Sequence, residues 1–324
     1  MMTEESLIDE IILGDAIKVM KEIPTGTIAM TFADPPFNLK KSYGHYLDSK
    51  ELNDYNKWCE EWIGEMVRIT KPDGSIFVHN LPKWLTYHAY YLNRKAKFRH
   101  WIAWNAMGAP LGKTLLPNHY GILYYVKSEN FKFRDLRTSH PRCRSCGELL
   151  ADYGGKKKQI HPFGVLLSDV WTDIHRIRHS SRRDTHPCQL PIHLLERLIL
   201  MATDEGDVVL DPFLGTGTTA VAAKKLGRHY IGIDVDKEYV EMAKKKVQEA
   251  KPTKINGCYV SIFLNRIQTI RSKDFDKIEP CLKTEKLKIN GESFKQLSLP
   301  YFSRIDETNA SPSEPNKPTI KNII

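Results

Sequence analysis

The chain has 324 residues, 41% of them hydrophobic, and a formal net charge of +9. This size and apolar content exclude a disordered chain and provide for one principal domain with additions. Six cysteines in a chain this long do not make a disulfide scaffold. We also see no apolar run of membrane-spanning length and no signal peptide at the N-terminus, so we expect a soluble intracellular protein.

The first informative segment is the apolar run at 27–33, which predicts a buried strand and ends in Asp34-Pro35-Pro36-Phe37. Each proline fixes its own φ and holds the preceding residue extended, so this loop is stiff. We expect the Asp34 carboxylate and the Pro35 carbonyl to lie close together at the carboxyl edge of the sheet. The Phe37 ring would stand beside them as an apolar wall.

Two neighbouring acceptors suit the exocyclic amine of a nucleobase. That nitrogen is a poor nucleophile because its lone pair is delocalised into the ring. Acceptors for both N–H groups favour a pyramidal nitrogen whose lone pair points outward, and the carboxylate stabilises the positive charge that develops on attack. The alternative is an ordinary turn after a strand, and the tetrapeptide alone leaves both interpretations open.

The middle of the chain predicts the rest of a sheet. We expect a strand at 75–79, a helix near 83–93, and strands around 100–104 and 121–126, the last two forming an antiparallel end. His79 and Asn80 end the first of these strands near the expected site. Either residue lines a base pocket or, in the commoner role, forms a cap or turn.

Residues 131–185 form an insertion with a basic character. They hold 12 Lys and Arg against 6 Asp and Glu, a net charge of 12 − 6 = +6, which is two thirds of the net charge of +9 of the whole chain. Two interpretations are open. Such a stretch either neutralises DNA phosphates or is a solvated loop whose charge keeps it soluble. Within it, Cys143 and Cys146 are spaced so that their thiolates can bind one zinc ion, with His140, His161 or Cys188 completing the site. A second C-x-x-C motif is missing. Reduced thiols in a small subdomain are therefore favoured over zinc.

The second informative segment begins with an apolar strand at 207–210 and continues as Asp211-Pro212-Phe213-Leu214-Gly215-Thr216-Gly217-Thr218-Thr219 into a helix. Glycines let the backbone approach a ligand, and a helix start offers unpaired N–H groups. The next strand, 230–233, ends in Asp234, a position that usually accepts from ribose hydroxyls. The third glycine of a dinucleotide fingerprint and a phosphate-loop lysine are both missing. A nucleoside without phosphates, such as S-adenosylmethionine, stays open.

The order of these two motifs resembles that of the β-group amino DNA methyltransferases of restriction–modification and orphan systems. In that family a D-P-P-[YF] motif precedes a cofactor motif D-P-F-x-G-[ST]-G-T-T, as it does here. Leu13-Gly14-Asp15, Asn38-Leu39 and the segment from His186-Pro187 to Pro191 also fit. The resemblance covers residues 7–248 or nearly so.

The resemblance implies an α/β fold with a methyltransferase-type, doubly wound, mostly parallel sheet, an antiparallel terminal hairpin and an inserted target-recognition region. It assigns the target base to the catalytic residues Asp34, Pro35, Pro36 and Phe37, with Phe37 in place of the more usual tyrosine. It assigns S-adenosylmethionine to Asp15, Asp211, Phe213, Gly215, Thr216, Gly217, Thr218 and Asp234. Asp15 would bind the adenine amino group of the cofactor.

The resemblance also implies a partner, duplex DNA, read by the insertion. We expect the phosphate or guanine contacts to come from the basic residues Arg176, Arg178, Arg182 and Arg183. A homodimer and a cognate restriction endonuclease are further expectations, and no membrane partner is expected. The protein would work in a bacterial or archaeal cytoplasm, at the nucleoid.

The expected reaction is methylation of adenine N6 after the base is flipped out of the duplex, because a stacked base blocks in-line approach to its amine. Adenine is favoured because the family mostly pairs an aspartate at the first motif position with adenine and a serine with cytosine. Cytosine N4, an RNA substrate and an inactive DNA-binding module are the alternatives.

The expected organisation has five parts. Residues 7–130 and 186–249 form the catalytic domain, the second of these parts binding the cofactor. Residues 131–185 form the recognition insertion, 250–302 a small C-terminal extension and 303–324 a polar, proline-rich tail expected to be disordered.

Overall fold

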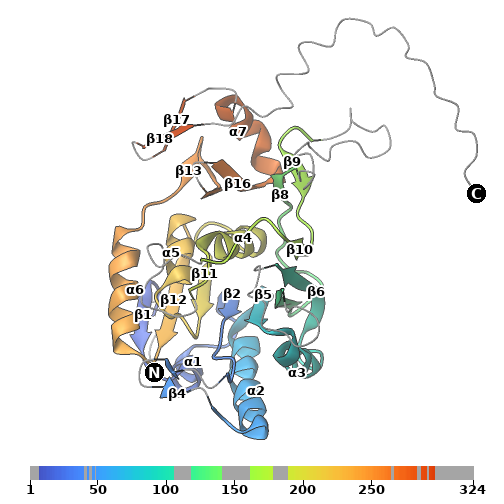
Figure 1. Cartoon of the computed structure of the whole chain (residues 1–324), viewed down its shortest axis with the longest axis vertical. Helices are drawn as coiled ribbons and strands as arrows, with labels where there is room; N and C mark the ends of the chain where they lie inside the picture. The colour runs from blue at the N-terminus through green and yellow to red at the C-terminus, as the bar shows by residue number, and fades with distance from the viewer. Residues whose placement is uncertain are drawn as a thin grey trace, which may run out of the picture.

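The computed structural model describes residues 7–39, 42–43, 46–47, 49–105, 118–140, 161–177, 189–263, 266–282, 286–289 and 292–295 (Figure 1). Its centre is an eight-stranded sheet in the order β1-β12-β11-β2-β5-β7-β6-β10. In that order the strands are β1 (Glu10–Leu13), β12 (His229–Asp234), β11 (Val208–Asp211), β2 (Ile28–Ala33), β5 (Thr70–Asn80), β7 (Tyr120–Val126), β6 (Lys97–Trp104) and β10 (Val170–Trp171).

The sheet is parallel from β1 to β5, while β7 pairs antiparallel with both β5 and β6. This confirms the expected mostly parallel sheet with an antiparallel hairpin. The hairpin is not the edge, however, because β10 from the insertion pairs parallel with β6 through Val170 and Trp171. The insertion therefore contributes a strand to the main sheet.

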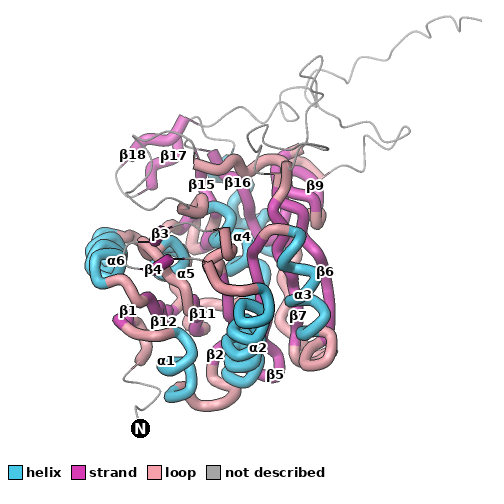
Figure 2. Tube along the Cα trace, turned by 60° about the horizontal axis from the view of Figure 1, so that its bottom comes forward, coloured by secondary structure: helices cyan, strands magenta, loops and turns pink. Residues whose placement is uncertain are grey.

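Helices cover both faces of this sheet (Figure 2). On one face pack α1 (Ala16–Glu22), α2 (Leu52–Ile69) and α3 (Pro82–Leu92). On the other face pack α4 (Ile192–Ala202), α5 (Thr218–Lys225) and α6 (Lys237–Glu249). Strand β2 shows the result, since all six of its residues are buried: Ile28 and Ala33 join one core, while Met30 and Phe32 join the other. A central parallel strand is apolar on both sides for this reason.

A second, four-stranded sheet joins two regions that are far apart in the sequence. Its order is β15-β16-β8-β9, with β15 (Ser261–Phe263) and β16 (Arg266–Arg271) from the C-terminal extension, and β8 (Leu136–Ser139) and β9 (Gly164–Leu166) from the insertion. A small core with Phe163, Ile270 and Phe275 packs beside it, with helix α7 (Phe275–Leu282). Insertion and extension thus build one module, which lies together at one end of the molecule (Figure 1).

The remaining elements are short. They are β3 (Ser42–Tyr43), β4 (Tyr46–Leu47), β13 (Lys254–Ile255), β14 (Cys258–Tyr259), β17 (Lys286–Ile289), β18 (Glu292–Lys295) and the 3-10 turn η4 (Ser272–Asp274). Within the described ranges, no helix has both the length and the apolar character that crossing a membrane requires.

The connections reverse direction between β11 and β2. From β11 the chain passes through α5 to β12, on one side of the sheet order, and from β2 it passes through α2 to β5, on the other. The two crossover helices lie on opposite faces. In an open α/β sheet, a ligand binds outside the carboxyl ends of the strands where the order reverses in this way. The two sequence motifs follow these two strands directly.

Candidate active site

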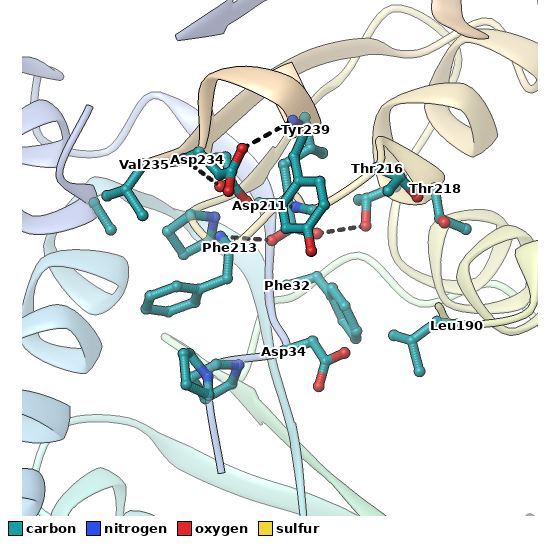
Figure 3. Close-up of a pocket in the computed structure, with 18 of the residues that line it drawn as sticks. Phe32, Asp34, Leu190, Asp211, Phe213, Thr216, Thr218, Asp234, Val235 and Tyr239 are labelled. Atoms are coloured by element: carbon teal, nitrogen blue, oxygen red, sulfur yellow. Dashed lines mark hydrogen bonds between the residues drawn. The ribbon is translucent and has the colours of Figure 1, made fainter. Parts of the chain in front are cut away.

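A cavity of about 360 Å³ opens at the carboxyl ends of β11 and β2. It brings together the two motifs, which lie more than 170 residues apart in the sequence (Figure 3). From the first motif, Asp34, Pro35, Pro36 and Phe37 line it. From the expected cofactor set, it is lined by Asp15, Asp211, Phe213, Gly215, Thr216, Thr218 and Asp234. A volume in this range fits a small-molecule site.

The tetrapeptide after β2 is held from both sides. The Tyr55 hydroxyl donates a hydrogen bond of 2.6 Å to the Pro36 carbonyl, which ties the loop to helix α2. Asn38, in the left-handed region at φ 53°, exchanges two hydrogen bonds of 2.8 Å with the backbone of Lys50. The stiff loop expected from the two prolines is therefore also anchored at its end, and Lys50 lines the cavity.

Asp34 is the catalytic carboxylate of the sequence interpretation. Its Oδ1 lies 2.7 Å from Nδ1 of His79, and its side chain retains 16% of its exposure, so it faces the cavity. Phe37 is buried, and its ring centroid lies 5.7 Å from that of His79 and 6.1 Å from that of Tyr120. The aspartate and the aromatic wall are thus packed as one unit.

Asp211 organises the glycine loop. Its carboxylate accepts from the backbone N–H of Phe213 at 2.9 Å and from the Thr219 hydroxyl at 2.5 Å, so it joins the start of the loop to helix α5. Gly215 lies in the left-handed region at φ 54°, and its N–H donates to Asp234 at 2.8 Å. This conformation explains the glycine at position 215.

Gly217 is the one expected cofactor residue that does not line the cavity as described. It caps α5 at φ 92°, and a Cβ there would lie 2.7 Å from the Cβ of Ala243. The glycine therefore lets helix α6 pack closely against the loop. Its structural role is to allow this helix packing.

The second carboxylate of the cofactor half, Asp234, ends β12. Its two oxygens accept from the N–H groups of Gly215 at 2.8 Å and Asp236 at 2.9 Å. Asp15 accepts from the Lys18 N–H at 3.0 Å and so caps helix α1 at the rim of the same cavity. Both carboxylates keep lone pairs for hydroxyl or amine donors.

The electrostatics of the cavity favour a cation. Burial raises the pKa of Asp211 to about 7, against the hydrogen bonds from Thr219 and Phe213, and the carboxylates of Asp34 and Asp234 raise it further. Burial also raises the pKa of Asp234. Carboxylates that disfavour each other's ionisation are stabilised by a positive group placed between them. A ligand with a sulfonium and an ammonium group meets this requirement.

Sequence reasoning missed several residues that line the cavity. Trp58 comes from α2, Tyr239 from α6, and Gln189 and Leu190 from the segment that leads into α4. The segment from His186-Pro187 to Pro191 was a signal for Gln189 and Leu190. Trp58 and Tyr239 carry no motif, because only the packing of their helices brings them to the cavity.

The expected DNA and metal residues fall mostly outside the described residues. Arg176 is described and partly buried, whereas Arg178, Arg182, Arg183, Cys143 and Cys146 lie outside. His140 Nε2 contacts the carbonyl of His161 at 2.9 Å, and the His161 Nδ1 accepts from the Phe163 N–H at 3.2 Å. In the described part of the chain, no three His, Cys, Asp or Glu residues form a group that could hold a metal ion.

Comparison with known proteins gives consistent results. A family model described as DNA methylase matches residues 28–245. The type II methyltransferase M.BamHI of Bacillus amyloliquefaciens is 40% identical over 81% of this chain, and the match spans 63% of its own length. M.HpaI of Haemophilus parainfluenzae is 34% identical over 73% of each chain. The DNA adenine methyltransferase YhdJ of Escherichia coli strain K12 is 30% identical over 74% of this chain and 83% of its own.

Solved structures share the fold. TTHA0409 of Thermus thermophilus, described as a DNA modification methylase complexed with S-adenosyl-L-methionine, has a TM-score of 0.52 at 21% identity, over 75% of this chain and 94% of that one. The cytosine-N4-specific PvuII DNA methyltransferase has a TM-score of 0.52 at 19% identity, over 73% of this chain and 85% of that one.

Proposed function

The chain belongs to the DNA methylase family, and on that ground we propose that it transfers a methyl group from S-adenosylmethionine to the N6 amine of adenine in duplex DNA. The observation that supports this most directly is the shared cavity. Residues of the D-P-P-F tetrapeptide and residues of the glycine loop line the same space. A base bound at the first and a cofactor bound at the second would therefore meet.

The cofactor residues fit the chemistry of the ligand. Asp234 and Asp15 would accept from its hydroxyl and amine groups, and Phe213 would give an apolar contact. The buried Asp211, whose pKa is raised to about 7 by burial and by the neighbouring carboxylates, would lie near the positive charge. When bound, S-adenosylmethionine supplies a methyl group on a sulfonium sulfur, and transfer breaks the S–C bond as the N–C bond forms.

The first motif would activate the amine. Asp34 and the Pro35 carbonyl accept its two N–H groups, which leaves the nitrogen lone pair directed at the methyl group. As the nitrogen gains positive charge, the Asp34 carboxylate stabilises it, and one N–H proton then leaves through Asp34 to solvent. Phe37 holds the plane of the base. Fixing both reactants in line could contribute roughly 7–11 kcal/mol to the lowering of the barrier.

DNA contact would come from the module that the insertion and the C-terminal extension build together. The insertion carries most of the positive excess of the chain, and Arg176 follows β10 in the chain. Charge of this kind gives salt-dependent affinity for phosphates. The target base must leave the stack to reach Asp34, which lies in the cavity.

Adenine is proposed over cytosine on two grounds. Aspartate stands at the first position of the motif, and one relative bears the name DNA adenine methyltransferase. A cognate endonuclease is part of the proposal because other relatives are named type II methyltransferases. The proposal also includes that the protein is a homodimer and that it works in a bacterial or archaeal cytoplasm, at the nucleoid.

The test is a product analysis. The protein is incubated with S-adenosylmethionine labelled in its methyl group and with unmethylated duplex DNA, and the DNA is digested to nucleosides. We expect labelled N6-methyladenine and no label after Asp34→Ala. Labelled N4-methylcytosine would show that the target base is cytosine and not adenine. Label in RNA alone would show that the substrate is not DNA. No label in any nucleic acid would reject the proposed activity.

A further inference from the structure

His79 is a buried side chain beside the Asp34 carboxylate. The reaction described above gives His79 no role. We infer that it is a positioning residue: it fixes the orientation of Asp34 so that one carboxylate oxygen stays free for the target amine. This inference rests on the proposed function, because it concerns how Asp34 is presented to a base.

The position of His79 follows from the register of two neighbouring strands. Strands β2 and β5 are parallel, and their last paired residues are Ala33 and Val78. One residue further on each strand, Asp34 and His79 face each other. The contact joins residues 45 positions apart in the sequence, so strand pairing alone places the imidazole against the carboxylate.

The contact is short and shielded. His79 Nδ1 lies 2.7 Å from Asp34 Oδ1, and the histidine side chain retains only 3% of its exposure. The rings of Phe37, Tyr120 and Trp104 surround it, with centroids 5.7, 5.3 and 5.7 Å from its own. A hydrogen bond to a charged group is strong where water is excluded in this way.

The surroundings also select the tautomer. The other ring nitrogen, Nε2, is buried and has no hydrogen-bond partner among the described residues. A proton on Nε2 would leave a buried N–H donor unpaired there, at a cost in free energy. The tautomer with its proton on Nδ1 leaves only an acceptor unpaired. In that form His79 donates to Asp34, which remains an acceptor.

The hydrogen bond gives the two oxygens of the Asp34 carboxylate different roles. Oδ1 is held by His79, so Oδ2 is the oxygen left for an N–H of the target amine. The same imidazole packs against Phe37, and it therefore fixes the aromatic wall relative to the acceptor. A misplacement of about 1 Å in such a group can reduce turnover about 10²-fold.

Three substitutions test the inference. His79→Asn keeps an N–H near the position of Nδ1, whereas His79→Leu keeps bulk without a donor. His79→Gln carries the same amide, but its extra methylene moves the N–H beyond the position of Nδ1. The matched control is His88→Leu, because His88 is also buried, packs on Trp62 and lines no part of the cavity.

We expect His79→Leu and His79→Gln to lower the single-turnover rate about 10²-fold, with unchanged affinity for S-adenosylmethionine and for DNA. His79→Asn should recover most of the rate, and His88→Leu should keep it. Equal rates for the Asn and Gln variants, or a normal rate for His79→Leu, would overturn the inference. The Asn and Gln comparison stands even where the Leu variant does not fold.

A spectroscopic measurement separates this inference from the proposed function. In protein labelled with nitrogen-15 at histidine, the signals that vanish in His79→Asn belong to His79. They should show a proton on Nδ1 and should shift in Asp34→Ala. Protonation at Nε2 alone would overturn the inference. This outcome is readable even if the wild-type protein transfers no methyl group, a result that would reject only the proposed function.

Discussion

The Arg197 guanidinium donates two hydrogen bonds to the Asp173 carboxylate, at 3.0 and 2.6 Å. Arg197 belongs to helix α4 and is fully buried, with its guanidinium over the Trp171 ring and a further hydrogen bond of 3.3 Å to Thr269. One side chain of the catalytic core thus contacts both halves of the second module, the insertion and the C-terminal extension.

Asp173→Ala should therefore be strongly destabilising. Removal of Asp173 leaves the buried Arg197 charge without its carboxylate. Because the Asp173 side chain retains 36% of its exposure, water offsets part of this loss, and we expect a cost of about 2–3 kcal/mol in the free energy of unfolding. The control is Glu129→Ala, which breaks exposed ion pairs with Lys97 and Arg99 and should be far less destabilising, because water screens exposed charges. Urea unfolding followed by circular dichroism measures both values. Equal losses for the two variants would contradict the assigned role.

Asp34→Asn should stop catalysis while the cofactor still binds. The amide keeps the shape of the side chain but cannot stabilise positive charge on the amine, so the single-turnover rate should fall at least about 10²–10³-fold. Calorimetric titration with S-adenosylmethionine should give nearly the wild-type affinity, because the described hydrogen bond of Asp34 goes to His79 and not to the glycine loop. Ordinary turnover in this variant would remove Asp34 from the catalytic role.

Asp234→Ala should show the opposite pattern. The substitution removes the acceptor for the Gly215 N–H and for the cofactor, so the dissociation constant of S-adenosylmethionine should rise about 10–100-fold, as expected for a hydrogen bond to a charged group. The control is Asp9→Ala, an exposed carboxylate paired with His229 at the other end of β12. Its cofactor affinity should be normal. An unchanged affinity in Asp234→Ala would exclude this carboxylate from the cofactor site.

The raised pKa of Asp211, about 7, predicts that cofactor binding depends on pH. Below that value Asp211 is protonated, and above it the carboxylate is ionised and attracts a cation, so affinity should rise between pH 6 and 8 and binding should release a proton. Calorimetry in buffers of different ionisation enthalpy measures the proton. Asp211→Asn controls for titration of the ligand itself and should flatten the profile. An identical slope in both proteins would count against the assignment.

The same shift has a consequence for the stability of the protein without ligand. The pKa of Asp211 is higher in the folded state than its ordinary value of 3.8, so the unfolded state loses this proton first. Folding is therefore progressively disfavoured as pH rises from about 4 to about 7. Relative to Asp211→Asn, the wild-type melting temperature should fall over that interval.

Gly217→Ala should be costly for two separable reasons. The residue has φ 92°, and a Cβ would lie 2.7 Å from the Cβ of Ala243. The control is Gly206→Ala, since Gly206 has φ 81° but open space around it. The control should lose about 1 kcal/mol from backbone strain alone, and Gly217→Ala should lose about 2–4 kcal/mol because the clash adds to it. Thermal unfolding compares the two, and similar losses would show that the clash is relieved.

The parts of the site that the sequence predicted are those that follow directly from strand ends. Asp34 and Asp211 each stand at the end of an apolar run, and parallel strands bring such ends to one edge of a sheet. The helix that follows the second motif was also expected from the sequence. That the two motifs meet at one site could therefore be predicted without information on tertiary contacts.

The missing parts depend on pairing and packing between distant segments. His79 was recognised as lying near the site, but its hydrogen bond to Asp34 depends on the register of β2 and β5. Asn80, by contrast, has the turn role, since its side chain accepts from the Leu81 N–H at 2.7 Å. Likewise, nothing in the order of the chain indicates that β16 pairs with β8. Local patterns carry no information about which strands become neighbours.

Under the proposed function, in which the insertion contacts DNA, the pairing of β16 with β8 bears on how sequence specificity could be exchanged between relatives. A graft of residues 131–185 alone would carry two strands of a four-stranded sheet and leave their partner strands behind. The transplanted β8 would then expose an unsatisfied edge, a template for aggregation. Swapping specificity would require moving both stretches of the gene together, along with the arginine of α4 that binds them.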